Sequence, residues 1–321
     1  MKRFLITMAA VILGIITAAI ASDLIIESDT QSYNEKESKI KFNGNVRVQL
    51  DDVHVESDKA DVTVTKKNKL DVATFYDKPY AFQLQENKKK EVKANILKLS
   101  LITKILKAEG DTQSIVTDGK DPMVMITADT QIYDINTNVL TALGGVIIKY
   151  QDVQTYSDKA VIVTDKNGEL KKLDLYGNAK VQEKASNAEA DHFTYDAVKE
   201  ELYAVGNTMT HTVTDDNIPL TVKSKYQHYN KLNNIYNASG NVRVWYDDYY
   251  AKGPKMNVYP DKTTNKFNEI YFTGRSMINQ EDKTIYADKI KMILNPKDFY
   301  AEGNTKTVIQ NIKKESVDGG K

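Results

Sequence analysis

The stretch Phe42-Asn43-Gly44-Asn45-Val46-Arg47-Val48 decides the fold, because its last five residues return unchanged as Gly240-Asn241-Val242-Arg243-Val244. In the first copy, Phe42, Val46 and Val48 alternate with polar residues. A period of two is typical of a β-strand that buries one face and exposes the other. The stretch therefore predicts a half-buried strand, and its return predicts a chain built from β repeats.

A fixed spacing extends this pattern over the chain. Six blocks begin at a small residue and reach a glycine sixteen residues later: Ser28 and Gly44, Ala94 and Gly110, Ala128 and Gly144, Ala190 and Gly206, Ser224 and Gly240, Ala287 and Gly303. A second block type runs from Ser57 to Asp77, from Ser157 to Gly177 and, two residues longer, from Lys252 to Gly274. Together these positions predict nine units of about 33 residues, grouped as three super-repeats of about 98.

The apolar positions of the blocks predict a folded sheet with an apolar interior. Large residues twelve positions into a block stand beside small ones at fourteen, which gives a tapered cross-section. A unit of this size cannot bury its own face and has to stack on its neighbours. We therefore expect an all-β fold of repeated antiparallel strands, in which two facing sheets form an elongated hydrophobic trough rather than a closed barrel.

The residues on the buried side of the period-two alternation are the candidates for lining a lipid-binding groove. They are Tyr33, Ile40, Phe42, Val46, Val48, Leu99, Leu106, Tyr133, Leu140, Ala142, Val146, Ile148, Tyr195, Leu202, Ala204, Tyr229, Tyr236, Val242, Val244, Met292 and Phe299. The same residues also suit a solenoid core that is simply filled. The pattern alone leaves both interiors open.

The N-terminus has the features of an export signal. Two basic residues precede an apolar run from Phe4 to Ala21, which ends in the small-residue triplet Ala19-Ile20-Ala21. Such a stretch predicts a secretory signal cleaved after Ala21, with an uncleaved anchor as the alternative. The expected organisation is a signal peptide at 1–21, one repeat domain at 22–310 and a polar C-terminal tail at 311–321.

Composition excludes several classes of protein. Lys and Arg together number 44 and so do Asp and Glu, so the chain lacks the basic surplus of a nucleic-acid-binding protein. There is no cysteine, which excludes a disulfide framework and thiol chemistry. No nucleophile or phosphate-loop motif occurs, and the four histidines lack metal-ligand spacing. We expect no catalytic residue, metal or cofactor, and we interpret Lys88-Lys89-Lys90 as a solvated loop.

Three stretches in order carry a family resemblance: Leu24–Tyr33, Phe42–Val48 and Ser57–Val62. They resemble the start of a mature OstA-like (LptA-type) domain, and the pattern recurs to about residue 310. The resemblance implies a β-jellyroll or β-taco whose groove takes the acyl chains of lipopolysaccharide or a similar acylated lipid. It also implies a periplasmic bridge from the inner to the outer membrane. Its partners are a single-span inner-membrane protein and an outer-membrane barrel with similar folds, and head-to-tail homo-oligomers are allowed.

Three hypotheses follow. The first is a lipid-carrying bridge that performs no covalent step. The second is a structural β-solenoid scaffold with a filled core, or the periplasmic part of a membrane-anchored partner of the same transport system. The third is an enzyme on a parallel β-helix, which requires clustered carboxylates and basic residues on one face. The aligned copies show no such cluster, so we favour the first hypothesis.

Overall fold

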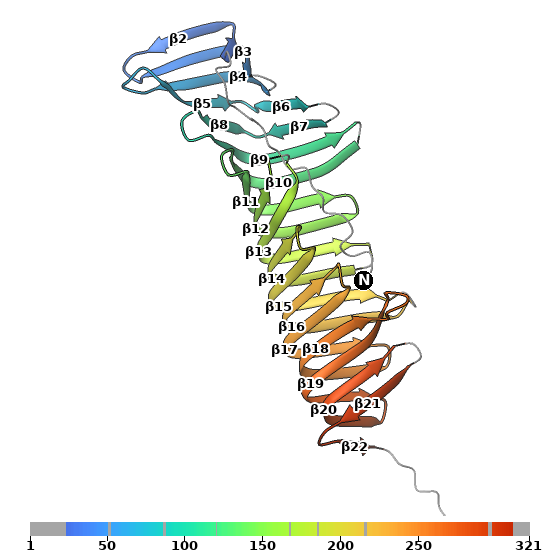
Figure 1. Ribbon diagram of the computed structural model, residues 1–321. Coiled ribbons are helices and arrows are strands. Elements are labelled where there is room, and N and C mark those ends of the chain that lie inside the picture. The colour runs from blue at the N-terminus through green and yellow to red at the C-terminus, as the bar shows by residue number, and fades with distance from the viewer. Residues whose placement is uncertain are drawn as a thin grey trace, which may run out of the picture. The chain divides into compact units, whose positions relative to one another are not determined.

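The computed structural model describes residues 24–50, 53–85, 88–119, 121–166, 168–184, 186–214, 217–294 and 297–310. The expected signal peptide and C-terminal tail lie outside these residues. The described chain divides into two compact units: an N-terminal unit of residues 24–184 and 192–198, and a C-terminal unit of residues 186–191 and 199–310. Each unit consists of β-strands, shown in Figure 1. Among the described residues, no helix is long and apolar enough to span a membrane.

The strands follow the turn signals of the sequence. The N-terminal unit holds β1 (Leu24–Glu27), β2 (Thr30–Asn34), β3 (Lys39–Leu50), β4 (Val53–Val64), β5 (Leu70–Tyr76), β6 (Tyr80–Gln85), β7 (Lys88–Lys93), β8 (Ile96–Ser100), β9 (Ile105–Asp118), β10 (Asp121–Asp134), β11 (Val139–Tyr150), β12 (Val153–Thr164) and β13 (Leu170–Glu183). Strand β14 (Ser186–Asp196) has residues in both units. The C-terminal unit holds β15 (Glu201–Val213), β16 (Pro219–Asn230), β17 (Ile235–Tyr246), β18 (Tyr249–Pro260), β19 (Phe267–Gln280), β20 (Lys283–Ile293), β21 (Asp298–Glu302) and β22 (Lys306–Ile309).

Neighbouring strands within each unit pair antiparallel. Strand β3 pairs with β4 from Lys39 opposite Thr63 to Leu50 opposite Val53. In the C-terminal unit β17 pairs in the same way with β16 and with β18. The predicted all-β antiparallel fold is confirmed.

Every second long strand is interrupted at a punctuating glycine. The register of β3 against β4 shifts between Asn43 and Val46, and Gly44 and Asn45 in between have φ values of 77° and 46°. A left-handed glycine at the first position of a β-bulge bends the strand and increases its twist. Gly44 is required here for a second reason, because an added Cβ would overlap the carboxylate of Asp29.

The bends fold each unit into two arms that share one core. In the C-terminal unit, Ala238 and Val244 lie on either side of the bend in β17, and Phe272 and Ile278 lie on either side of the bend in β19. All four residues belong to the same buried cluster. Residues before and after a bend therefore face each other, as expected for a folded trough. Burial of this apolar surface is the main stabilising contribution.

The expectation of a solvated loop at Lys88-Lys89-Lys90 is wrong. These residues begin β7, which pairs with β6 on one side and β9 on the other. Lys90 alternates with Val92 on the inward face and is only 4 % exposed. The run is a strand because its two neighbours supply partners for its backbone, which outweighs the low strand propensity of lysine.

The layers β5–β6 and β7–β8 are split strands. Strand β4 pairs with β5 along one half and with β6 along the other. Asp77 stands at the split, where the other copies have glycine, and both Asp77 and Lys78 have a φ of 63°. Asp77 and Lys78 are consecutive non-glycine residues in the left-handed region, and the strand is interrupted there. At the equivalent position of β13, Gly177 bends the strand without interrupting it.

The length of the third second-type block also needs a correction. Ser57 and Ser157 lie opposite Val46 and Val146, and the residue opposite Val242 is Gly253 rather than Lys252. The block therefore starts at Gly253 and is one residue longer than its sisters, not two. The extra residue lies in the connection 261–266 between β18 and β19, which corresponds to 165–169 between β12 and β13.

Candidate functional site

The C-terminal unit contains a pocket of about 410 Å³. This volume lies within the range of about 300–1,000 Å³ that small-molecule sites occupy. The lining residues are Thr212, Thr214, Leu220, Val222, Tyr236, Val244, Tyr246, Met256, Val258, Asp261, Thr264, Lys266, Phe267, Asn268, Ile270 and Leu294.

The pocket lies between the two arms, toward their tips. One wall comes from the end of β15, the start of β16 and the end of β17, where Val222 and Val244 are direct cross-strand neighbours. The opposite wall comes from the start of β17, the end of β18 and the start of β19, where Tyr236, Val258 and Ile270 are paired in sequence. Alternation along these strands places apolar side chains on both walls.

The connection 261–266 forms a polar rim on this pocket. Asp261 Oδ1 accepts hydrogen bonds from the backbone N–H groups of Thr264 at 2.7 Å and Thr263 at 3.0 Å. These bonds and the bond from the Thr264 hydroxyl lower the pKa of the Asp261 carboxyl. Asn234 Nδ2 donates to the carbonyl of Asn265 at 2.6 Å and ties the connection to the turn before β17. The rim is therefore a fixed loop beside an apolar interior.

Tyr236 differs from the rest of the pocket wall. It is 5 % exposed, and its hydroxyl has no hydrogen-bond partner among the described residues. Thr210, whose hydroxyl donates to Gln227 Oε1 at 2.5 Å, lies beside the phenol. Burial raises the pKa of the Tyr236 phenol, and the nearby Thr210 lowers it by less. Tyr236 therefore keeps its proton as a donor.

The interior of the N-terminal unit is closely packed around two small pockets. Two pockets there measure about 40 Å³, near Phe42 and Phe75, and about 20 Å³, near Leu106 and Leu140. The smaller one has room for about one water molecule. Ala142 is 0 % exposed. The arms in this unit therefore pack directly against each other.

The structure places the groove candidates in three groups. Those buried inside the arms are Phe42, Val46, Leu106, Tyr133, Leu140, Ala142, Val146, Ile148, Tyr195, Ala204, Tyr236, Val242, Val244 and Met292. Those that are half-buried are Ile40, Val48, Leu99, Leu202, Tyr229 and Phe299. Tyr33, on β2, is 59 % exposed.

Among these candidates, Tyr236 and Val244 line the pocket of about 410 Å³. Most of the wall, including Met256, Val258 and Ile270, lies outside the first block type and was not predicted. The same period of two in β18 and β19 identifies them.

Polar side chains that the sequence did not reveal also lie inside the arms. Gln131 Nε2 donates to Thr112 Oγ1 at 2.9 Å, and Ser114 Oγ donates to Gln131 Oε1 at 2.7 Å. The C-terminal unit repeats this arrangement with Thr210 and Gln227. Because these groups are buried, their hydrogen bonds to one another offset the cost of desolvation.

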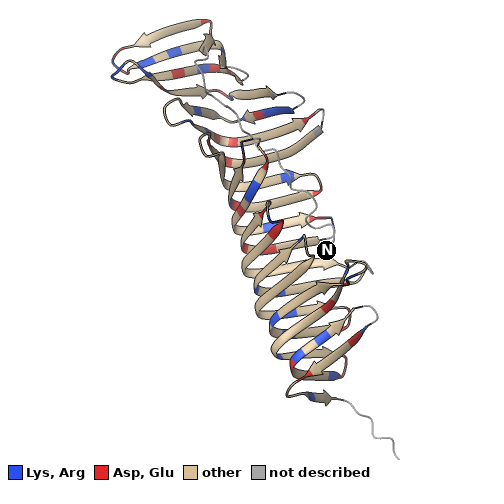
Figure 2. Cartoon of the chain, in the orientation of Figure 1, with Lys and Arg blue, Asp and Glu red and all other residues tan. Residues whose placement is uncertain are grey.

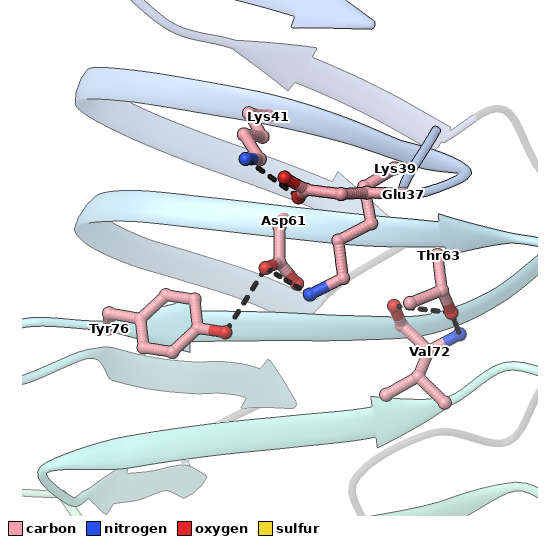
Figure 3. Close-up of polar contacts among 7 residues, drawn as sticks. All are labelled: Glu37, Lys39, Lys41, Asp61, Thr63, Val72 and Tyr76. Carbon is pink, nitrogen blue, oxygen red and sulfur yellow. Dashed lines mark hydrogen bonds and ion pairs between the residues drawn. The ribbon is translucent and has the colours of Figure 1, made fainter. Parts of the chain in front are cut away.

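The outward faces carry most of the charges. Basic and acidic residues are interspersed along the strands (Figure 2). Figure 3 shows one cluster on β3, β4 and β5, where Asp61 accepts from Lys39 Nζ at 3.0 Å and from Tyr76 Oη at 3.1 Å. The bond to Asp61 is the main cause that raises the pKa of Lys39. Ion pairs close to the surface contribute little to stability.

Within the described ranges, no group of three or more acidic or histidine side chains is placed to hold a metal ion. His192 lies near Asp174 and Thr194 in a part-buried network: Thr194 Oγ1 donates to Asp174 Oδ1 at 2.6 Å, and His192 Nε2 lies 3.2 Å from the same oxygen. A hydroxyl that donates directly to the carboxylate is not activated by the imidazole.

Comparison with known proteins gives a family match and a distant similarity to a solved structure. The family model described as LptA/(LptD N-terminal domain) LPS transport protein matches residues 25–122 and, a second time, residues 125–221. A solved structure, LptH, described as the LptA homologous periplasmic component of the conserved lipopolysaccharide transport device from Pseudomonas aeruginosa, is 11 % identical. That similarity covers 40 % of this chain and 95 % of LptH, with a TM-score of 0.35. No curated protein gives a significant match.

Proposed function

The chain belongs to the family of LptA/(LptD N-terminal domain) LPS transport proteins, and from that premise we propose that it is a periplasmic bridge that holds the acyl chains of lipopolysaccharide between its two arms. The bridge carries the lipid from the inner to the outer membrane. No covalent step is needed, because the lipid leaves as it entered.

One observation carries this proposal: the pocket of about 410 Å³ between the arms of the C-terminal unit. Its walls are apolar, which suits hydrocarbon tails, and its rim at Asp261, Thr264 and Lys266 is polar, which suits the end of a lipid that meets water. Burial of an acyl chain contributes about 0.8 kcal/mol per CH₂ group. A pocket of this size therefore supplies enough apolar contact for useful affinity.

The filled interior of the N-terminal unit supports the scaffold as the second candidate function. Val146 and Ile148 are 1 % and 2 % exposed, so an acyl chain enters between these arms only if they separate. On the bridge proposal, lipid parts the arms as it passes. On the scaffold proposal, the arms stay closed and the unit serves only as a spacer.

The ends of the described sheet suit partners of similar fold. Strands β1 and β2 pair only with β3, and β21 and β22 pair only with β20, among the described residues. Their outer edges offer backbone groups for strand addition by another chain. We propose that these edges meet a single-span inner-membrane partner, an outer-membrane barrel or a second copy. We further propose the organisation stated above: a signal at 1–21, a repeat domain at 22–310 and a tail at 311–321.

Native mass spectrometry of the mature chain, purified from a cell envelope without detergent, tests the proposal. We expect lipopolysaccharide to co-purify, or a bound lipid to be displaced by added lipopolysaccharide. A chain that is lipid-free and fails to bind added lipopolysaccharide contradicts the bridge and favours the scaffold. Retention of the N-terminal segment in the mature mass favours the membrane-anchored partner instead.

A further inference from the structure

One outward face of the C-terminal unit carries three basic residues side by side. Arg243 on β17 lies opposite Lys223 on β16 and opposite Lys252 on β18. All three are exposed, and Arg243 stands between the buried Val242 and Val244. Like charges directly across neighbouring strands destabilise a sheet. The row therefore costs stability, and the packing of the fold does not explain it.

The repeat does not require bases at these positions. In the first super-repeat the equivalent row is Glu27, Arg47 and Glu56, in which opposite charges alternate. In the second super-repeat the row is Thr127, Ile147 and Tyr156, which carry no charge. The same sheet therefore forms with mixed, absent or wholly basic charge, and the basic row is a property of the third copy.

Neighbouring acids do not neutralise the row. Among the described residues, Arg243 and Lys252 have no ion-pair partner. The acids Asp247 and Asp248 lie in the turn after β17, and Asp247 there pairs with Lys297. The positive charge on this face is therefore available to an anionic partner.

Aromatic rings lie beside the bases. Trp245, two residues after Arg243 on the same strand, is 39 % exposed, and the centroid of its ring lies 5.3 Å from that of Tyr250 on β18. Lys223 Nζ lies 5.8 Å from the centroid of the Trp245 ring. Tyr286, further along the basic row on β20, is 42 % exposed. Rings with an apolar body and a polar tip are typical of surfaces that meet the head-group region of a membrane.

The backbone of this face is closed to strand addition, because β16, β17, β18 and β19 each pair with a neighbour on both sides. A partner therefore binds through side chains alone. Bases on three adjacent strands, with exposed rings beside them, match a plane of anionic head groups better than one extended peptide.

We propose that this basic face docks the C-terminal unit onto a bilayer surface that contains anionic phospholipid. The residues of the basic face are Lys223, Arg243, Lys252, Trp245, Tyr250 and Tyr286. The bases attract the lipid phosphates, and the rings enter the head-group layer. Docking on this outward face is independent of what the pocket between the arms binds, so it goes beyond the proposed function.

Vesicle binding is the test. The full mature chain is mixed with vesicles of phosphatidylethanolamine and phosphatidylglycerol, or with vesicles of phosphatidylcholine alone, and bound protein is measured by sedimentation. Trp245 is the only tryptophan of the sequence, so its fluorescence reports on the basic face directly. We expect binding to the anionic vesicles alone, a shift of the emission to shorter wavelength, and weaker binding at high salt.

A triple variant removes the three bases: Lys223→Gln, Arg243→Gln and Lys252→Gln. We expect its partition coefficient to fall by about fivefold for each base removed, and the emission shift to disappear. Its melting temperature should be kept or rise, because repulsion across the strands is relieved. The matched control changes the net charge equally at lysines that pair with Glu200, Glu302 and Glu269: Lys231→Gln, Lys289→Gln and Lys291→Gln. The control should keep both the binding and the shift.

Wild type that ignores the anionic vesicles overturns the proposal, and so does an equal loss of binding in the two triple variants. Binding without a change in the Trp245 emission also overturns it, because another surface then meets the membrane. If polyglutamate shifts the emission and the vesicles do not, the partner is an acidic polypeptide rather than a bilayer. The assay contains no lipopolysaccharide, so a failure here leaves the proposed function standing.

Discussion

Asn45 Nδ2 lies 3.0 Å from Asp29 Oδ2, and this contact closes the first bend of the folded sheet. The same pair returns as Asn207 with Asp191 at 3.1 Å and as Asn304 with Asp288 at 2.7 Å. In each pair the carboxylate occupies the space in which the glycine before the asparagine lacks a side chain. The bend is therefore a three-residue device of Asp, Gly and Asn that recurs along the repeat.

Gly206→Ala tests this device. Gly206 has a φ of 75°, and an added Cβ would overlap the carboxylate of Asp191. We expect the free energy of unfolding to fall by about 1–3 kcal/mol, the usual cost of a non-glycine residue in this region plus the displaced carboxylate. Gly119→Ala is the matched control, since its φ of 64° is similar and no atom lies within 4 Å of the added Cβ. Urea unfolding that shows equal losses for both variants contradicts a role for Asp191.

Ala142→Leu tests whether the N-terminal unit is filled. Ala142 is 0 % exposed, so the larger side chain has no space and should destabilise the fold by about 1–3 kcal/mol. The control is Val205→Leu, at a position 45 % exposed, where a change within about 0.5 kcal/mol is expected. If thermal and urea unfolding leave Ala142→Leu as stable as wild type, an open channel runs through this unit.

Val258→Phe tests the C-terminal pocket. Val258 is 5 % exposed and borders the cavity of about 410 Å³, so the larger ring can occupy existing space. We expect the melting temperature to be kept and binding of lipopolysaccharide to fall at least tenfold. Unchanged lipid binding in a folded variant would mean that the lipid lies elsewhere.

Alkaline pH should destabilise the fold through two equivalent tyrosines. Tyr133 and Tyr229 donate to Asn138 and Asn234, each at 3.0 Å, and burial raises the pKa of each phenol to about 12. The unfolded chain ionises near pH 10, so their contribution is complete below that pH and is lost between about pH 10 and 12. Melting temperatures over this range should fall less steeply for the double variant Tyr133→Phe, Tyr229→Phe. An identical slope in both proteins contradicts the assignment.

Much of the fold was predictable because strand period and glycine spacing are local properties of the sequence. The alternation around Phe42 and Val46 predicts the strand, and the glycines mark where it bends. The role of Asp29 was not predicted, because its partner Asn45 lies sixteen residues away and only the bend brings the two side chains together.

The pocket was less predictable, because a cavity is a property of volumes summed over several strands. Tyr236 and Leu140 follow the same pattern, yet one borders a large pocket and the other a very small one. The inward position of Lys90 escaped for a related reason. A run of lysines is expected to be exposed to solvent. Only the pairing of β7 with β6 and β9 places the side chain of Lys90 inside.

Site-specific photo-crosslinking in growing cells tests the central claim most directly. A photoreactive amino acid is placed at Phe267, which borders the pocket, and in a second strain at Trp245, which is 39 % exposed on the outer face of β17. The account predicts a lipopolysaccharide adduct from the first position and none from the second. Adducts from Trp245 alone, or from neither position in a folded and exported chain, would contradict the binding of lipid between the arms.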